Sequence, residues 1–404
     1  MGLIAFLRAN ARWLAAGALM SFLSSFGQTY FIGVFAGEIR ADFGLSHSAW
    51  GTLYAAATTV SAGVMVWAGA LTDRFRARAM AAAVLVLLAA ACTLMAVNRV
   101  WLLLPVTIFL LRFSGQGMLS QIAIVSMSRW FVAARGRALS LAALGFALGE
   151  ALLPMTLVAL MPVVGWRSLW LVAAAVALAM IPVLALLLRH ERTPQSMAET
   201  SHAAGMDGLH WTRRMVLRHW LFWLVIPALM GPPAFNTAFF FQQVQFAEVK
   251  GWAHLDLVRL FPLYTATGVA STLLSGWALD RFGVRRIMPW YLLPIAGAFA
   301  VFSLAPTPAA MIPGLLLLGM TNGTLATLPS TFFASHYGTR HLGAIKALTM
   351  AVLVLGSAIG PGLSGVLIDA GVRLPTQYMG MAVYFLGATV LVQIGLRKAR
   401  NLLD

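Results

Sequence analysis

Two short stretches decide the fold: GALTDRFRARAM at residues 69–80 and GWALDRFGVRRIM at residues 276–288. Each follows a long apolar run, and the aspartates within them, Asp73 and Asp280, lie 207 residues apart, about half the chain. Other landmarks share this spacing: Gly136 with Gly343, Gly149 with Gly356, and Pro154 with Pro361. The shared spacing predicts that the chain consists of two halves of the same design.

The composition excludes most classes of soluble protein. Of the 404 residues, 60% are hydrophobic and 10% are charged, whereas soluble domains are about 45–50% apolar and about 25% charged. A soluble enzyme and a disordered protein are therefore excluded. The only cysteine, Cys92, leaves no intrachain disulfide and no thiolate metal cluster. The membrane class remains.

The apolar runs predict the architecture. A spanning helix needs about 20 apolar residues. We predict an all-α integral membrane protein, with twelve transmembrane helices in two six-helix pseudo-repeats around a central cavity. The predicted helices cover residues 13–36, 48–70, 79–97, 100–125, 138–161, 167–188, 220–246, 257–278, 287–305, 310–333, 344–368 and 376–396.

One polar stretch, residues 189–219, divides the chain, since it is the only long one. It contains charged residues, Pro194 and Gly205, which are typical of an exposed linker. We therefore predict an N-terminal bundle at 1–188, a cytoplasmic linker at 189–219 and a C-terminal bundle at 220–404.

The net charge of +16 has an uneven distribution. With a cytoplasmic N-terminus, 21 of the 28 Lys and Arg residues fall in inside segments and six fall outside. The positive-inside rule then predicts that both termini are cytoplasmic. The charge reflects topology and not nucleic-acid binding. We expect a multi-pass protein of the cell membrane, which is the inner membrane if the source is bacterial.

The two loops resemble the signature G-x-L-A/S-D-R-x-G-R-R/K of the major facilitator superfamily. The first copy departs from it at Thr72, Arg76 and Ala77. The resemblance implies alternating-access transport by two rocking halves, in which these loops form a cytoplasmic latch. The latch residues are Gly69, Asp73, Arg74, Arg78, Gly276, Asp280, Arg281 and Arg285.

A second stretch gives a narrower resemblance. RWFVAARGRALSLAALGFALGEALLP at 129–154 is similar to the monocarboxylate and oxalate–formate exchanger branch of that superfamily. Drug antiporters carry G-x-x-x-G-P-x-x-G-G in their fifth helix. Gly145 and Gly149 match it, but Glu150 stands where proline is expected. This departure counts against drug export without excluding it.

Two ionisable residues lie deep in the predicted membrane helices. Arg112 is near the middle of run 100–125, and Glu150 is the only carboxylate in a predicted helix core. Arginine keeps its proton, whereas a glutamate can lose its charge by protonation. We hypothesise that ionised Glu150 pairs with Arg112, and that protonation frees Arg112 to bind an anionic substrate. The alternatives are a permanent structural salt bridge, or an Arg112 satisfied by backbone carbonyls.

Polar side chains within the predicted spans indicate a substrate cavity, with interhelical packing as the alternative. Residues Ser21 to Thr29 place polar groups on one face of a regular helix, and Arg112, Gln116 and Ser120 are spaced i, i+4, i+8. The predicted cavity residues are Gln28, Thr29, Arg112, Gln116, Asn236, Gln243 and Asn322.

Prolines and glycines predict hinges. Pro232 and Pro233 should break run 220–246, because each removes a backbone donor. Static kinks are the alternative. In run 344–368 the predicted hinge residues are Gly356, Gly360 and Pro361.

The pattern predicts a proton-coupled secondary transporter of a small organic solute, with an organic anion such as a monocarboxylate as the best guess. A proton-driven exporter of multiple drugs or amphipathic compounds is one alternative, and a non-transporting membrane receptor or scaffold is another. No enzyme is expected, because no P-loop, metal site or acid–base set is found. The expected partners are a small-molecule substrate, protons and membrane lipid, with no cofactor, no metal and no nucleic acid, and the chain is expected to work as a monomer.

Overall fold

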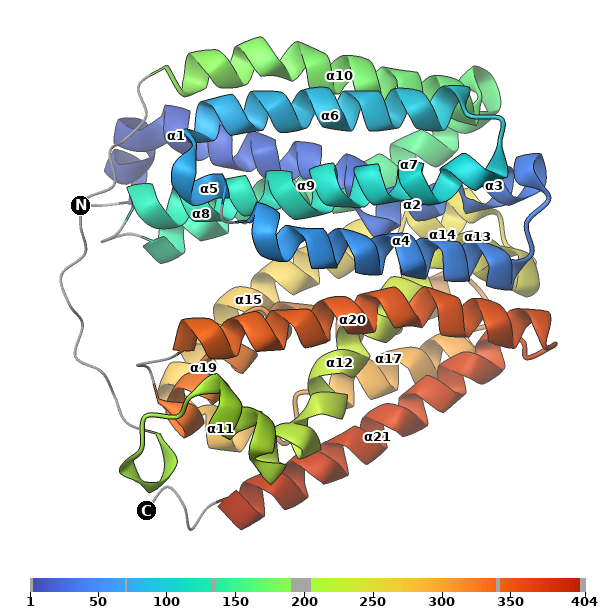
Figure 1. Ribbon diagram of the computed structural model, residues 1–404. Helices are drawn as coiled ribbons and strands as arrows, with labels where there is room; N and C mark the ends of the chain where they lie inside the picture. The colour runs from blue at the N-terminus through green and yellow to red at the C-terminus, as the bar shows by residue number, and fades with distance from the viewer. Residues whose placement is uncertain (1–2, 70, 132–134, 190–204, 339–341, 400–404) are drawn as a thin grey trace. The chain divides into compact units, whose positions relative to one another are not determined.

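The computed structural model describes residues 3–69, 71–131, 135–189, 205–338 and 342–399 (Figure 1). Within these ranges the chain is helical and contains no β-strand. It separates into two compact units, Met1–Ala198 and Glu199–Asp404. The division falls within the polar stretch at 189–219.

The N-terminal unit is built from long apolar helices and short connecting turns. The helix α4 begins where the Ser46 hydroxyl accepts a hydrogen bond from the Ala49 amide at 3.1 Å, an N-cap. The helices of this unit are α1 (Leu3–Leu23), η1 (Ser24–Gly27), α2 (Thr29–Val34), α3 (Ala36–Phe43), α4 (His47–Ala68), α5 (Leu71–Arg74), α6 (Ala77–Val97), η2 (Trp101–Leu103), α7 (Leu104–Leu111), η3 (Arg112–Leu119), α8 (Ser120–Trp130), α9 (Arg135–Val164) and α10 (Trp166–Leu187).

The C-terminal unit has the same kind of construction. Several of its helices carry proline at the first or second position, where the missing amide has no helical partner to lose. Its helices are η5 (Met206–Gly208), α11 (Arg213–Arg218), α12 (Trp220–Phe241), α13 (Gln243–Lys250), α14 (His254–Val258), α15 (Phe261–Phe282), α16 (Val284–Ile287), α17 (Leu293–Leu304), η6 (Ala309–Met311), α18 (Ile312–Leu325), α19 (Leu328–Tyr337), α20 (Leu342–Asp369) and α21 (Leu374–Ala399).

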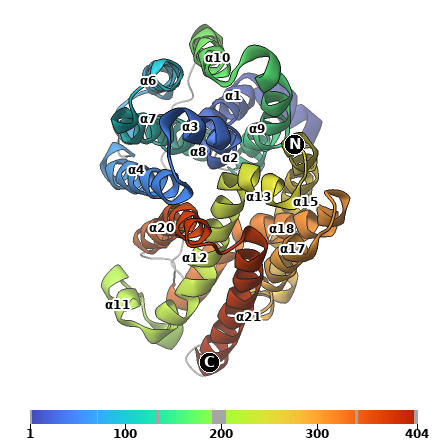
Figure 2. The same ribbon diagram turned by 90° about the vertical axis from the view of Figure 1, so that its right-hand side faces the viewer.

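Each unit packs its main helices in the same three pairs (Figure 2). In the N-terminal unit α1 lies on α9, α4 on α7 and α6 on α10. In the C-terminal unit α12 lies on α20, α15 on α18 and α17 on α21. In chain order, each set pairs the first predicted helix of its half with the fifth, the second with the fourth and the third with the sixth.

Eight helices in the described part of the chain are long and apolar enough to cross a membrane. Two more apolar helices, Leu293–Leu304 and Ala309–Leu325, are shorter. Helix occupies each of the twelve predicted ranges, but twelve crossings remain a prediction. The eight candidate spans are Ala77–Val97, Trp101–Met127, Ala138–Val164, Trp166–Leu187, Trp220–Phe241, His254–Leu279, Leu348–Asp369 and Leu374–Ala399.

The prediction that Pro232 and Pro233 break their helix is wrong, because α12 continues through both. Pro232 has no amide to donate to the carbonyl of Ala228, one turn earlier. The hydroxyl of Tyr291 donates to this carbonyl instead. Tyr291, which lies outside α12, therefore replaces the hydrogen bond that proline removes, and the helix stays intact.

The helical path is interrupted further along, at Gln242 (φ −96°, ψ 16°), between α12 and α13. The other predicted hinge residues lie inside the continuous helix α20. There, Gly356 and Gly360 pack against the backbone of Met230 and Ala234 in α12. A side chain at either glycine would collide with that backbone, so both glycines bring the two helices together.

Candidate functional site

The first helix of the N-terminal unit is broken in its middle. The helix α1 ends at Leu23, η1 follows as a 3-10 turn, and Gln28 is extended (φ −86°, ψ 155°) before α2 begins. The prediction that Ser21 to Thr29 form one face of a regular helix is therefore wrong. The Ser24 hydroxyl donates to the carbonyl of Ser21 at 2.7 Å, a local bond that competes with regular helical geometry.

The break leaves one carbonyl without a helical donor. The amides of Phe31 and Ile32 both donate to the carbonyl of Gln28, at 3.2 and 3.1 Å. The carbonyl of Gly27 therefore lacks the amide that a regular helix would give it. Nη1 of Arg112 donates to it instead, at 3.1 Å. The buried arginine thus stabilises the open turn.

Arg112 is almost fully enclosed, with 1% of its surface exposed. Nη1 also donates to Oγ1 of Thr29 at 3.2 Å, and this hydroxyl is hydrogen-bonded to that of Tyr54 at 2.6 Å. Cζ of Arg112 lies 5.3 Å from the centre of the Tyr54 ring, a cation–π distance. Nε and Nη2 have no hydrogen-bond partner among the described residues. Two donor atoms of a buried cation thus have no described partner.

The backbone around Arg112 is a π-helix, η3, and not a regular α-helix. The predicted common face of Arg112, Gln116 and Ser120 assumed regular α-helical spacing, from which η3 departs. Two glycines explain the geometry. A Cβ added at Gly115 would lie 2.7 Å from both Cα and N of Gly27, so the two backbones touch. The wide turn of η3 accommodates the narrow turn of η1.

This contact gives a first prediction. Gly115→Ala places a methyl group against a backbone that cannot move aside, and we expect a loss of about 1–3 kcal/mol of stability. The apparent melting temperature of the purified protein should fall by several degrees. The control is Gly63→Ala on α4, where a Cβ meets nothing within 4 Å. If both variants melted at the wild-type temperature, the close contact between Gly115 and Gly27 would not contribute to stability.

Glu150 lies on the helix α9 and is 6% exposed. Its neighbour Gly149 packs directly against the side chain of Ser25 in η1. The Ser25 hydroxyl accepts a hydrogen bond from that of Tyr30 at 2.8 Å, and Glu150 interacts electrostatically with Tyr30. Glu150 therefore borders the broken segment, as Arg112 does, but through different residues.

No hydrogen bond joins the two ionisable groups in this structure. The hydrogen bonds of the Arg112 guanidinium go to Gly27 and Thr29, and its other nitrogens bond to no described residue. Arg112 is hydrogen-bonded to the segment 24–30, whereas Glu150 acts on Tyr30 of that segment electrostatically and follows Gly149, which packs on Ser25. That segment is the element through which one group can influence the other.

The predicted cavity residues of the C-terminal unit are neutral. Nδ2 of Asn236 donates to the hydroxyl of Tyr264 at 3.3 Å, while its Oδ1 has no described partner. Gln243 is fully buried, donates to the carbonyl of Phe240 at 2.9 Å and contacts His254 at 3.2 Å. Asn322 is partly exposed on α18. Of these residues, Asn236 has a buried acceptor without a described partner.

In the predicted latch loops the structure describes the backbone, while the side chains of Asp73, Arg74 and Asp280 lie outside its described part. Gly69 follows α4, and Gly276 lies within α15. Arg78, Arg281 and Arg285 are exposed.

The departure of the first loop from the superfamily signature has a backbone reason. Gly283 adopts φ +77°, a left-handed value that favours glycine. The corresponding residue of the first loop, Arg76, adopts φ −66°, which any residue can take. Glycine is therefore required in the second loop and not in the first.

Two tyrosines of the site were not predicted. Tyr54 and Tyr30 are both buried and bind the residues that surround Arg112 and Glu150. A signal was present, because a tyrosine inside a membrane helix needs a partner for its hydroxyl. The sequence could not identify those partners, which come from other helices.

The apolar helices and the enclosed polar site define a multi-pass membrane protein of the transport type. The family model of the Major Facilitator Superfamily matches residues 17–361 and, a second time, residues 260–400. The chain belongs to this superfamily. It is accordingly a transporter and not an enzyme.

Curated relatives of two kinds are similar to the chain. "Monocarboxylate transporter 13" of Bos taurus is 26% identical over 298 residues, which are 72% of this chain and 67% of that protein. "Multidrug resistance protein B homolog" of Mycobacterium tuberculosis is 33% identical over 103 residues. That match covers 24% of this chain and 18% of the relative.

Solved structures share the fold at low identity. A bacterial homolog of the human lysosomal transporter Spinster aligns over 98% of both chains with a TM-score of 0.70 and 15% identity. The nucleoside transporter NupG, solved as a mutant, aligns over 96% of this chain and 99% of its own, with a TM-score of 0.72 and 14% identity.

Proposed function

We propose that the chain is a proton-coupled secondary transporter of a small organic anion, such as a monocarboxylate. One observation carries this proposal: Arg112 is buried, yet Nε and Nη2 of its guanidinium have no partner among the described residues. A carboxylate fits two guanidinium donors in a bidentate manner. A buried donor without a partner is unfavourable, so an anion that accepts these bonds binds with a gain.

We propose that Gln28, Thr29 and Gln116 line the site beside Arg112, and that Asn236, Gln243 and Asn322 contribute from the C-terminal unit. The similarity to a bovine monocarboxylate transporter agrees with an anionic solute.

A ligand screen tests this function. The purified protein is heated with carboxylates, sugars, amino acids or cationic dyes, and its apparent melting temperature is measured. A ligand that binds the native state must stabilise it. We expect carboxylates to raise the melting temperature and cationic dyes to leave it unchanged. Stabilisation by dyes alone would reject an anionic substrate.

A proton-driven exporter of drugs or amphipathic compounds is the second candidate. The 33% identity to a multidrug resistance protein homolog over 103 residues favours it. The buried carboxylate of Glu150 would then bind the cationic substrate. The same screen separates the two candidates.

For the architecture, we propose twelve spans in two six-helix repeats, with both termini in the cytoplasm of the cell. The identical helix pairs of the two units and the shared spacing of 207 residues support duplication. The repeats would rock about a substrate site, with the chain working as a monomer.

Orientation gives the second prediction. Cysteine introduced at Ser201, which lies in the predicted linker and outside the described residues, is expected to face the cytoplasm. In a Cys92→Ala background, a membrane-impermeant maleimide should label Ser201→Cys in inside-out vesicles and not in intact cells. Labelling of intact cells would reverse the topology.

The latch gives the third prediction. We propose that Asp73 and Asp280 form charged contacts that hold the cytoplasmic side closed, together with the arginines of their loops. Asp73→Asn removes one of these charges and should lower the transport rate at least tenfold, while the protein still reaches the membrane. Asp280→Asn should have a smaller effect. If Asp73→Asn transports at the wild-type rate in vesicles, the loop charges are only solvated surface charges and the latch is rejected.

A further inference from the structure

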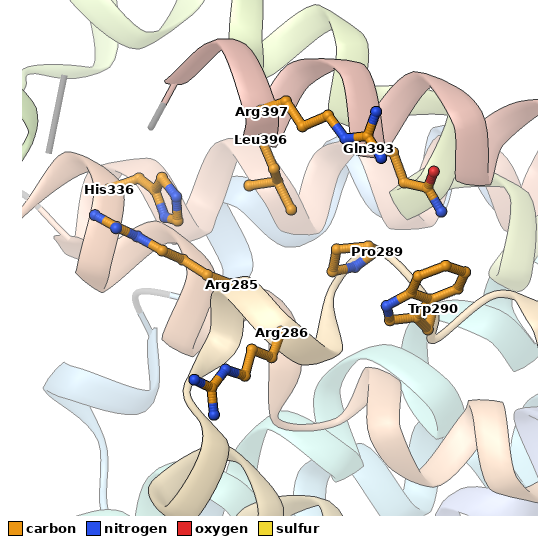
Figure 3. A pocket seen from close by; sticks show the side chains of 8 residues that line it. All are labelled: Arg285, Arg286, Pro289, Trp290, His336, Gln393, Leu396 and Arg397. Carbon is orange, nitrogen blue, oxygen red and sulfur yellow. The ribbon is translucent and has the colours of Figure 1, made fainter. Parts of the chain in front are cut away.

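A second polar site lies in the C-terminal unit, and none of the residues proposed to bind the substrate lines it. A pocket of about 380 Å³ opens between the segment that follows α15, the end of α19 and the end of α21 (Figure 3). It is lined by Arg285, Arg286, Pro289, Trp290, His336, Gln393, Leu396 and Arg397.

The pocket is strongly basic. Three of its lining residues are arginines and none is a carboxylate. The ion pairs described in the structure involve Arg167 and Arg259 and none of these three arginines. Burial lowers the pKa of His336 to about 4, so its ring is neutral at physiological pH. The arginines alone therefore set the charge, and the pocket attracts anions.

The surroundings of the pocket are those of a membrane–water boundary. Trp290 is 57% exposed, and exposed tryptophans concentrate at that boundary. Along α21, Val383, Leu386, Val390 and Ile394 are exposed and form an apolar stripe that runs toward Arg397. An acyl chain lying on this stripe would bring a headgroup to the arginines.

The geometry points to a binding site for the phosphate headgroup of an anionic phospholipid. Arginine forks bind phosphate oxygens in a bidentate manner, and Gln393 adds a neutral donor. The apolar stripe accounts for the acyl chains, which a free phosphate lacks. Arg285 also belongs to the proposed latch loop, so a bound lipid would share a residue with the gate. The site does not depend on which solute is transported.

Native mass spectrometry of the full chain tests the site. The protein is titrated with phosphatidylglycerol or phosphatidylcholine, and the dissociation constants are compared. A basic residue near a membrane surface contributes about fivefold in affinity for an anionic lipid. The variant Arg286→Gln/Arg397→Gln should therefore lose about 25-fold for phosphatidylglycerol, and each single variant about fivefold. Binding of phosphatidylcholine should not change.

The matched control is Arg213→Gln/Arg214→Gln, which removes the same charge from exposed positions of α11, outside the pocket. It should retain the preference for phosphatidylglycerol. Equal binding of the two lipids by the wild type, or equal losses in both double variants, would overturn the site. Displacement of the lipid by glycerol phosphate or inorganic phosphate below millimolar concentrations would assign the pocket to a soluble anion and overturn the lipid proposal.

Discussion

Arg112→Ala is expected to lower the affinity for the transported anion by about a hundredfold or more. Hydrogen bonds to a charged group contribute about 1.5–3 kcal/mol each, and Nε and Nη2 of Arg112 can make two such bonds to a carboxylate. The measurement is uptake of a radiolabelled carboxylate into vesicles as a function of its concentration. Arg112→Lys should keep part of the affinity, because it retains the charge but not the fork of two donors.

A structural role for Arg112 predicts a different result. The alanine variant loses two hydrogen bonds, to Gly27 and Thr29, but it also removes a buried cation with two open donors. The variant also leaves the buried carbonyl of Gly27 without a donor, so the apparent melting temperature should fall whichever role holds, and the affinity for the anion separates the two roles. A fall of many degrees with unchanged anion affinity would show that Arg112 only holds the broken helix.

Arg167→Ala is the matched control for this experiment. Arg167 lies in the same unit, donates to the carbonyls of Ala96 and Asn98 at 2.8 and 2.7 Å, and pairs with Asp42 at 3.1 Å. Its role is to tie helix ends together. Its removal should destabilise the protein while the affinity for the anion stays within about threefold of wild type, since Arg167 has no part in the proposed site.

The helices were predictable from the sequence because hydrophobic length is a local property. A run of about 20 apolar residues must bond its own backbone in lipid, and helix is the simplest solution. The pairing of helices within each half was not predicted. Gly149 and Gly356, which share the spacing of 207 residues, both lie at contacts between a first and a fifth helix.

The broken helix was not predictable, because its causes are distant in sequence. Gln28 is extended, and the Gly27 carbonyl that this frees is satisfied by Arg112, 85 residues further along the chain. The π-helix at Gly115 likewise depends on its contact with Gly27. The local sequence shows serines and glycines in these two segments, but it does not show that the backbones of the segments touch.

At Pro232 and Pro233 the sequence predicted a break in the helix that the structure does not have. Proline chemistry correctly predicts a missing hydrogen bond at Ala228, yet α12 remains continuous, because Tyr291 supplies a replacement. The cost of a proline in a membrane helix therefore depends on what lies beside it. Sequence reasoning identified the lost donor but not the group that replaces it.

The confinement of charge to one unit has a structural reason. At the shared spacing of 207 residues, Arg112 corresponds to Gly319, and a Cβ at Gly319 would lie 2.5 Å from the carbonyl of Tyr264. No arginine side chain fits at that contact. Thr29 corresponds to Asn236, and each bonds to a buried tyrosine of the neighbouring second helix. The two units thus share a polar position but not the charge.

Glu150→Gln is expected to abolish accumulation of substrate driven by a proton gradient, while exchange of substrate across the membrane continues. Glutamine is isosteric with the protonated acid and cannot release a proton. Glu150 and Arg112 both act on the segment 24–30. Arg112 is hydrogen-bonded to Gly27 and Thr29, and Glu150 acts electrostatically on Tyr30 and follows Gly149, which packs on Ser25. If protonation of Glu150 and anion binding at Arg112 favour the same arrangement of this segment, each ligand strengthens the other.

Two assays in reconstituted vesicles separate coupling from binding. The first measures accumulation under an imposed pH gradient, in which Glu150→Gln should fall to the level of empty vesicles. The second measures exchange of labelled for unlabelled substrate at equal pH, in which the variant should remain within about threefold of wild type. Glu248→Gln, at an exposed position of α13, is the control for loss of a carboxylate and should accumulate normally. Two outcomes would contradict the proposal. If Glu150→Gln accumulates substrate as the wild type does, Glu150 is structural and another group carries the proton. If the variant loses exchange as well as accumulation, the carboxylate is needed for the transport cycle itself, and the proposed coupling through segment 24–30 is rejected.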